Sequence, residues 1–156
     1  MEIHEKFMQV AIELASENIK NGGGPFGAVI VCNGEVVGRG ANRVTSNNDP
    51  TAHAEIMAIR DASSMLNRFD LSDCTLYTSC EPCPMCLGAI YWARIKNIYY
   101  GNTRADAAEI GFDDDYIYSE ISLPLNRRSV AMTPMLRSKA IKTFYSWAMM
   151  LNKESY

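Results

Sequence analysis

Hydrophobic and polar positions follow two periods along the chain, one typical of helices and one typical of strands. In residues 3–19 apolar side chains recur every three or four positions, which predicts an amphipathic surface helix. Two short apolar runs, residues 28–32 and 35–39, are separated by Asn33 and Gly34. Because an Asn-Gly pair favours the tight turn of a β-hairpin, these runs predict two antiparallel strands.

The rest of the chain predicts helices and strands in alternation. A polar loop that ends near Thr51 leads into an expected helix that continues to about Leu66. Another helix is expected to begin near Cys83, and the apolar stripe in residues 136–151 predicts a last one. Three further strands are expected, at residues 74–78, 97–101 and 129–132.

This order of elements predicts the fold class. Parallel strands need a crossover connection, which is usually a helix. A hairpin followed by strand, helix and strand therefore predicts an α/β fold, a three-layer α/β/α sandwich built on a mixed five-stranded sheet. The length fits a single domain, 1–156. Ligands of such sheets bind beyond the carboxyl ends of the strands, where a strand passes into a helix.

Composition and charge narrow the class of protein. The chain is 47% hydrophobic and 21% charged, with a net charge of −3, as in ordinary globular proteins. The acidic balance argues against a nucleic-acid partner and favours a small-molecule substrate. No apolar run reaches the roughly 20 residues that span a bilayer, and no secretory leader is seen, so we expect a cytoplasmic protein without membrane contact. Five cysteines then suggest free thiols, with Cys32 and Cys74 packed in the core.

Two cysteines have the spacing of metal ligands. Cys83 and Cys86 stand three positions apart, at which two thiolates can bind one zinc ion. Pro84 suits the first position of a helix, where a missing N–H costs nothing. Cys83 is therefore expected at the helix tip and Cys86 one turn further on. The unpaired N–H groups and the positive end of the helix dipole favour thiolates there.

The chain holds two histidines, and one of them is a candidate for the third ligand. His4 lies in the first predicted helix and is expected to be a solvated side chain. His53 is followed two positions later by Glu55. Because positions i and i+2 of a helix face roughly opposite sides, this pair can reach one metal only if the helix begins there. Three protein ligands with one open position describe a catalytic zinc site.

The two motifs together are more specific than either alone. A bare C-x-x-C also occurs in redox proteins and in closed structural zinc sites. The order H-x-E followed by P-C-x-x-C is the signature of zinc-dependent base deaminases, in which the glutamate transfers protons. In this interpretation His53, Cys83 and Cys86 bind the metal and Glu55 is the general acid and base. A non-catalytic, zinc-stabilised binding protein is the alternative, but it would have no need of Glu55.

Longer stretches around these motifs resemble a known family. Residues 23–30, 49–55 and 77–94 are similar to the cytidine and deoxycytidylate deaminase superfamily, and within it to bacterial guanine deaminases. Residues 111–114 and a chain that ends in Tyr156 extend the resemblance over nearly the whole length. The resemblance implies a cytidine-deaminase-like fold, a zinc cofactor and the hydrolytic deamination of guanine to xanthine and ammonia.

The resemblance also implies residues that would contact a purine base. Phe26 and Trp92 would pack against the ring, while Asn42 and the backbone of Ala54 would fix its orientation. Asp114 would be a second acid that serves the leaving amine. It belongs to a run of three aspartates, and Asp113 and Asp115 stay open as alternatives for this role.

The C-terminal part is implied to act in a homodimer. Tyr156 would complete the pocket of the other subunit, and the last helix, about residues 135–152, would be exchanged between subunits. The loosely patterned residues 101–126 are long enough to let that helix leave its own domain. Exchange of identical elements is a low-cost route to dimers.

Related reactions remain open as alternatives. A tRNA adenosine deaminase shares the zinc motif but needs a basic track for phosphates. The candidates for such a track are five cations that we expect to form a solvated helix face: Arg127, Arg128, Arg137, Lys139 and Lys142. Deaminases of guanosine or cytosine would differ in pocket shape, which the sequence does not fix.

Overall fold

The computed structural model describes residues 2–156, which fall into two compact units. The first unit ends at Tyr118 and contains the sheet, and the second comprises Ser119–Tyr156. Helix α6 (Asp114–Ser122) belongs partly to each unit. Among the described residues, no helix combines the length and the apolar character that crossing a membrane requires.

The sheet of the first unit is mixed, as predicted. Its bounds are Gly27–Cys32 for β1, Glu35–Ala41 for β2, Cys74–Cys80 for β3 and Asn97–Asn102 for β4. The strands lie in the order β2-β1-β3-β4, with β1 antiparallel to both neighbours and β3 parallel to β4. Every residue of β1 is buried, which explains its uninterrupted apolar sequence.

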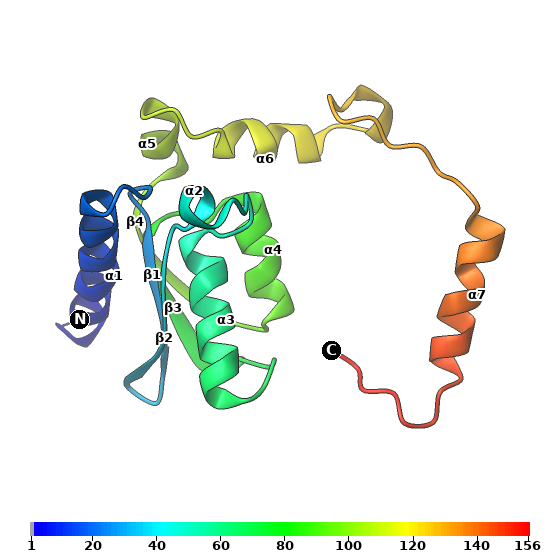
Figure 1. Ribbon diagram of the computed structural model, residues 1–156, viewed down its shortest axis with the longest axis horizontal. Coiled ribbons are helices and arrows are strands. Elements are labelled where there is room, and N and C mark those ends of the chain that lie inside the picture. Colours follow the sequence, from blue (N-terminus) through cyan, green and yellow to red (C-terminus); the bar gives the residue numbers. More distant parts are fainter. Residues whose placement is uncertain (1) are drawn as a thin grey trace. The chain divides into compact units, whose positions relative to one another are not determined.

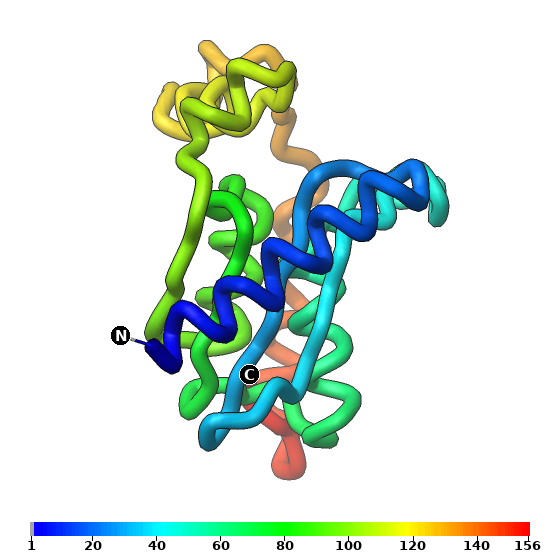
Figure 2. The backbone as a smooth tube through the Cα atoms, turned by 90° about the vertical axis from the view of Figure 1, so that its left-hand side faces the viewer, coloured from blue at the N-terminus to red at the C-terminus, as the bar shows by residue number. Residues whose placement is uncertain are grey.

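Helices cover both faces of this sheet (Figure 1). α1 (Glu2–Lys20) lies on one face, and α3 (Ala54–Leu66) and α4 (Pro84–Trp92) lie on the other. The view at right angles shows α1 crossing in front of the strands (Figure 2). Successive β1 side chains point to opposite faces, so Ile30 enters the core beneath α3 and α4, while Val29 packs in the core beside α1.

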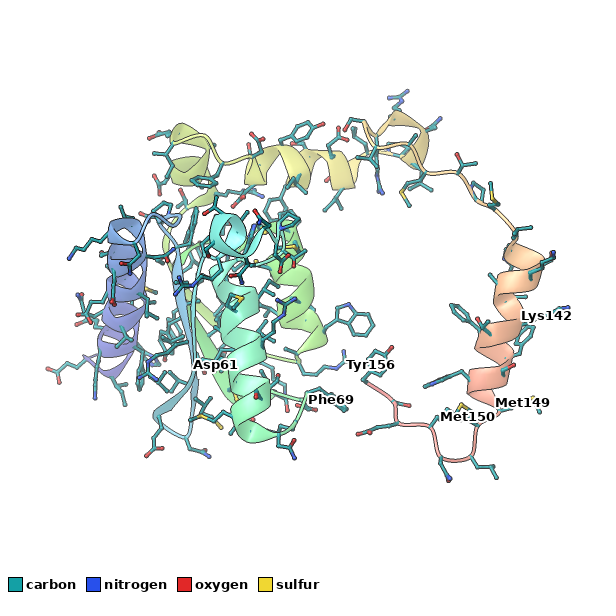
Figure 3. All side chains as sticks on the ribbon, viewed as in Figure 1. Asp61, Phe69, Lys142, Met149, Met150 and Tyr156 are labelled. Carbon is teal, nitrogen blue, oxygen red and sulfur yellow. The ribbon has the colours of Figure 1, made fainter. Side chains whose placement is uncertain are left out.

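α3 lies directly against β2 because the β2 residue at the contact, Gly40, has no side chain. A Cβ atom at Gly40 would collide with the carbonyl oxygen of Ala54 in the first turn of α3. Further along the helix, the carboxylate of Asp61 (Figure 3) accepts a hydrogen bond of 2.8 Å from the backbone N–H of Arg39. These contacts fix the position of α3 on the sheet.

His4 is not the solvated side chain that helix periodicity suggested. Its Nδ1 lies 2.7 Å from the hydroxyl of Tyr77, and its ring stacks on Tyr99 with centroids 4.4 Å apart. The two tyrosine rings, on β3 and β4, stack on each other at 5.1 Å. The pattern within one helix could not reveal this cluster because its other members come from distant strands.

Two short helices connect the larger elements of the first unit. α2 (Val44–Asn47) follows β2, and α5 (Arg104–Glu109) follows β4. α5 begins with a capping box, in which Thr103 accepts from the backbone N–H of Asp106 and the Asp106 carboxylate accepts from the backbone N–H of Thr103. This cap fixes the point at which the chain leaves β4 and enters α5.

The second unit contains the 3-10 helix η1 (Leu125–Arg127) and α7 (Arg137–Ala148). α7 lies within the range predicted for the last helix, and it has no buried residue in this chain. Its aromatic side chains, Phe144 and Tyr145 among them, are largely exposed. Met149 and Met150, which follow the helix (Figure 3), are exposed as well.

The predicted fifth strand at residues 129–132 is wrong. The sheet in the described residues has four strands, and 129–132 is irregular. Instead of pairing with a strand, the backbone N–H and hydroxyl of Ser129 both donate to Glu120, at 2.7 Å each. Val130 and Met132 are exposed. Four residues with an apolar pattern are too short a signal to identify a strand without knowing its partner.

Candidate functional site

Two helix N-termini meet at one place in the first unit. α3 begins at Ala54, directly after His53, and α4 begins at Pro84, directly after Cys83. Both preceding residues are N-caps in extended conformation. Proline at the first helical position and the extended N-cap explain why α4 starts there. α4 thus begins directly after Cys83, as predicted from Pro84, and α3 is capped by His53, two residues after the predicted end of the polar loop near Thr51.

The side chains of His53, Cys83 and Cys86 form a compact cluster. Nδ1 of His53 lies 3.5 Å from the sulfur of Cys83 and 3.5 Å from the sulfur of Cys86. The three donor atoms all lie within 4.8 Å of one another. Ligands at about 2.0 Å (nitrogen) and 2.3 Å (sulfur) in a tetrahedron around zinc would be separated by roughly 3.5 Å. This donor set therefore fits a zinc ion.

The two thiols of the cluster differ in acidity. Hydrogen bonds from the Cys86 thiol and from His53 lower the pKa of Cys83 to about 4. The same contact with Cys83, together with burial, raises the pKa of Cys86. The hydrogen bond to Cys83 also raises the pKa of His53. Cys83 is thus held as a thiolate, the form that binds metal ions.

Glu55 is a buried carboxylic acid beside the cluster. Its side chain is 6% exposed, and burial raises its pKa. Oε1 lies 3.1 Å from the hydroxyl of Thr78, and Oε2 lies 3.4 Å from the sulfur of Cys86. A carboxyl group whose pKa is raised by burial and that is fixed by hydrogen bonds can both accept and donate a proton.

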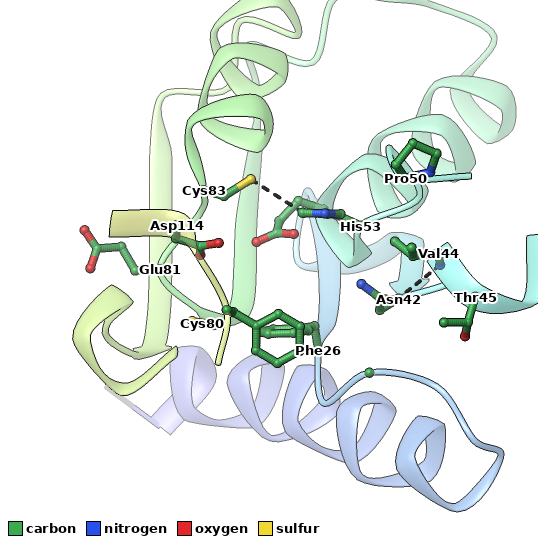
Figure 4. Close-up of a pocket in the computed structure, with 13 residues that line it drawn as sticks. Phe26, Asn42, Val44, Thr45, Pro50, His53, Cys80, Glu81, Cys83 and Asp114 are labelled. Carbon is green, nitrogen blue, oxygen red and sulfur yellow. Dashed lines mark hydrogen bonds between the residues drawn. The ribbon is translucent and has the colours of Figure 1, made fainter. Parts of the chain in front are cut away.

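A pocket of about 350 Å³ opens in front of these groups (Figure 4). This volume lies in the range of small-molecule sites. Its wall includes an aromatic pair, Phe26 and Phe112, whose rings meet edge to face at 4.7 Å. The full lining consists of Gly24, Phe26, Asn42, Val44, Thr45, Pro50, His53, Glu55, Cys80, Glu81, Cys83, Phe112 and Asp114.

Asn42 is held in a fixed orientation at the pocket wall. Its side-chain oxygen accepts a hydrogen bond of 3.2 Å from the backbone N–H of Val44, and its amide nitrogen points into the pocket in Figure 4. Its backbone carbonyl accepts from Asn18, at 2.9 Å. Asn18, which also binds the carbonyl of Gly24, is a buried polar residue of α1 that sequence reasoning missed. The sequence signal that could have identified Asn18 is that this polar residue falls on the buried side of α1.

The structure distinguishes the three aspartates of the acidic run. Asp114 lines the pocket, with its carboxylate directed inward (Figure 4), whereas Asp113 and Asp115 do not line it. Asp115 instead lies 3.6 Å from the guanidinium of Arg104. Burial, and next the thiolate of Cys83, raises the pKa of Asp114. This location is what a second acid of the site requires.

Three other residues predicted for substrate binding do not line this pocket. Ala54 is fully buried in the first turn of α3. Trp92 is the last residue of α4 and is 64% exposed, with the guanidinium of Arg94 at 5.9 Å from its ring centroid. Tyr156 lies in the second unit and is exposed.

Glu81 and Tyr118 were missed by sequence reasoning. Glu81 lines the pocket, and its carboxylate accepts a hydrogen bond of 2.9 Å from the backbone N–H of Arg104. The hydroxyl of Tyr118 donates to the carbonyl of Pro82, at 2.7 Å. These bonds fix α5 and the start of α6 against the turn that precedes Cys83. The available signal for Glu81 was its position directly before the P-C-x-x-C motif.

Comparison with known proteins agrees with this geometry. Residues 1–102 match the family described as the cytidine and deoxycytidylate deaminase zinc-binding region. The chain is 51% identical to the guanine deaminase of Bacillus subtilis (strain 168), over 98% of this chain and 99% of the relative. The X-ray structure of guanine deaminase from Bacillus subtilis superposes with a TM-score of 0.94 and covers 98% of both chains.

More distant matches share the core of the fold. A tRNA-specific adenosine deaminase of Haemophilus influenzae is 41% identical over 74% of this chain and 69% of its own length. The crystal structure of NE0047 in complex with 2,6-diaminopurine is 37% identical, with a TM-score of 0.69 over 71% of this chain and 62% of that one. A variant of NE0047 has been solved in complex with 8-azaguanine.

Proposed function

The chain belongs to the cytidine and deoxycytidylate deaminase family, and on that basis we propose that it hydrolyses guanine to xanthine and ammonia with a bound zinc ion. The observation that carries this proposal is the cluster of His53, Cys83 and Cys86 with Glu55 at the base of one small pocket. The 51% identity to a guanine deaminase over almost the whole chain supports the choice of substrate.

His53, Cys83 and Cys86 are the proposed zinc ligands. Such a donor set is typical of catalytic zinc sites. When bound by these residues, zinc would supply a nucleophile at neutral pH, because it lowers the pKa of a bound water to about 7. We place the protein in the cytoplasm, where reducing conditions keep both cysteines available to the metal.

Glu55 is the proposed proton carrier. It takes the proton of the attacking water and delivers it to a ring nitrogen of the purine, acting first as general base and then as general acid. Its burial and its raised pKa suit both steps. The hydroxyl of Thr78 holds the carboxyl group in position throughout.

Asp114 is the proposed second acid. Its carboxyl group lines the pocket together with His53 and Cys83, and its raised pKa favours a protonated form that can serve the leaving amine. Departure as ammonia requires a proton on the exocyclic nitrogen, and two carboxyl groups can divide the two proton transfers.

The pocket suits a flat purine base without its sugar. The ring of Phe26 provides an apolar face, and the amide nitrogen of Asn42 provides a donor to the edge of the base. The capacity of the NE0047 relatives to hold 2,6-diaminopurine and 8-azaguanine supports a purine ligand. The backbone of Ala54, at the start of α3, is proposed to contact the same base.

We further propose that Trp92 packs against the purine ring, and that the protein is a homodimer in which Tyr156 acts on the pocket of the other subunit. Trp92 is at the exposed end of α4, and α7 exposes its aromatic side chains. Exposed aromatic surface of this extent is typical of protein interfaces. Exchange of the C-terminal helix between subunits would bury it and bring Tyr156 to a pocket.

The proposal is tested by ammonia release from purified, zinc-loaded protein with guanine, guanosine, adenine, cytosine and a tRNA anticodon hairpin. We expect guanine to give the highest kcat/KM by at least tenfold. Glu55→Gln, which keeps the shape of the side chain, is the matched control and should be inactive on every substrate. Faster turnover of the tRNA hairpin or of guanosine would show that guanine is not the preferred substrate. Absence of zinc in the active protein would contradict the proposed mechanism.

A further inference from the structure

A second cluster of thiols lies at the end of the sheet opposite the pocket. Cys32 is the last residue of β1 and Cys74 is the first residue of β3, and the two are direct partners in the antiparallel register. The zinc-site turn follows Cys80, at the other end of β3. At about 3.3 Å per residue, the two ends of this strand are roughly 20 Å apart. The pair is therefore separate from the proposed catalytic site.

The geometry of the pair fits a disulfide between strands. Directly opposed residues of antiparallel strands have Cα atoms about 4.5–5.5 Å apart, within the range of about 4.4–6.8 Å that a disulfide requires. The two sulfurs and a carboxylate oxygen of Asp73 lie within 4.8 Å of one another. Rotation of the side chains alone can bring the sulfurs together.

The polar side chains of Arg68 and Asp73 contact these two thiols. Nη2 of Arg68 lies 3.8 Å from the sulfur of Cys32 and 3.9 Å from that of Cys74, and it forms an ion pair of 2.6 Å with Asp73. The guanidinium occupies the place that a metal ion bound by these three groups would need. Both thiols also lie 3.5 Å from carboxylate oxygens of Asp73, so Arg68 and Asp73 hold the two sulfurs side by side. Cys32 and Cys74 are buried, whereas Arg68 and Asp73, which cover them, are partly exposed, so displacement of these two side chains is the route by which an oxidant would reach the pair.

We propose that Cys32 and Cys74 form a reversible disulfide when the protein meets a peroxide. The thiolate of one cysteine attacks the peroxide, the O–O bond breaks, and a sulfenic acid and water form. The second sulfur then displaces the hydroxyl as a second water, so that two thiols are oxidised and one peroxide is reduced. Burial and the hydrogen bond with Cys32 raise the pKa of Cys74 to about 12, so Cys74 is suited to the resolving step, in which a thiol displaces the hydroxyl.

The consequence of the disulfide would be a more stable first unit with an unchanged pocket. The bond would close a loop that contains β2 and α3, and with them His53 and Glu55. Closing a loop of this length restricts the unfolded chain, and for a protein of this size the melting temperature should rise on the order of 10 °C.

The test uses the full-length, zinc-loaded protein treated with hydrogen peroxide, followed by alkylation of the remaining thiols. Digestion with trypsin and chymotrypsin, which cleaves after Tyr77, separates Cys74 from Cys80 for mass spectrometry. We expect a Cys32–Cys74 cross-link that dithiothreitol reverses, with zinc content retained. The higher melting temperature should be absent in Cys32→Ser and in Cys74→Ser. If either variant fails to fold, detection of the Cys32–Cys74 cross-link in the wild-type chain is the result that tests the proposal.

Arg68→Gln provides a second readout that does not remove a thiol. Loss of the guanidinium should slow formation of the cross-link several-fold, whereas Arg60→Gln, an exposed arginine of α3 that pairs with Asp49, should not. Alkylation of both Cys32 and Cys74 as free thiols after peroxide treatment would overturn the proposal. So would binding of a second zinc ion that is lost in both serine variants, since that would make the cluster a metal site.

Discussion

The hydroxyl of Thr78 lies 3.1 Å from Oε1 of Glu55 and 3.1 Å from the carbonyl oxygen of Cys80. A hydroxyl has one hydrogen, so it can donate to only one of these two acceptors at a time. When Glu55 is ionised, Thr78 donates to it, and when Glu55 is protonated, Thr78 can accept from it and donate to Cys80. The same contact thus accommodates both protonation states of the proposed proton carrier.

Thr78→Val should therefore reduce turnover without removing the metal. Valine matches the shape of threonine but leaves the buried carboxyl group without this partner. A hydrogen bond to a charged group contributes about 1.5–3 kcal/mol, so kcat should fall about tenfold to a hundredfold. Thr78→Ser, which restores the hydroxyl, should recover most of the activity. Steady-state kinetics at equal zinc content measure both, and an unchanged kcat in Thr78→Val would assign the hydroxyl a structural role only.

Glu55→Gln should abolish activity and keep the zinc. The amide has the same shape, but it cannot accept and return a proton. General acid–base catalysis contributes about 10²–10⁴-fold, which sets the smallest loss expected. Elemental analysis and circular dichroism should match the wild-type protein. A loss of less than tenfold would remove Glu55 from the mechanism.

Asp106→Asn should lower the melting temperature only above acidic pH. Hydrogen bonds from Thr103, first from its backbone N–H and then from its hydroxyl, hold the pKa of Asp106 below its ordinary value of 3.8. Because the folded-state pKa is lowered, the ionised group stabilises the fold above pH 3.8, and this contribution disappears as the pH falls through the folded-state pKa. Melting temperatures should differ at pH 6 and converge once the pH falls below the lowered folded-state pKa of Asp106. A constant difference at all pH values would contradict this assignment.

Mixed dimers test the proposed role of Tyr156. One chain carries Glu55→Ala in full length, and the other keeps Glu55 but lacks residues 153–156. Each homodimer should be nearly inactive. In the co-expressed mixed dimer, the truncated chain would receive a complete tail from its partner, so one site in two should regain activity. Mixed dimers as inactive as their parents would show that the tail does not act across an interface.

Local signals predicted the part of the site that depends on helix starts. Pro84 predicted that a helix begins at Cys83, and the H-x-E spacing required another helix to begin near His53. The structure has both helix starts and brings His53, Cys83 and Cys86 together there. The sequence alone could not select Asp114 within the acidic run, because three adjacent aspartates are chemically identical. The folded structure distinguishes them, since Asp114 is the one that lines the pocket. Residues 129–132 have the composition of a strand, but whether a strand forms depends on a partner that the sequence does not name.

The contact between Gly40 and the first turn of α3 makes an edge strand part of the catalytic geometry. Gly40 touches no group of the pocket, yet a single methyl group there would meet the carbonyl oxygen of Ala54, the residue between His53 and Glu55. Any shift of α3 that relieved this collision would move the proposed metal ligand and the proposed proton carrier together. A substitution of Gly40 would thus affect zinc affinity and turnover at once, although it lies outside the pocket.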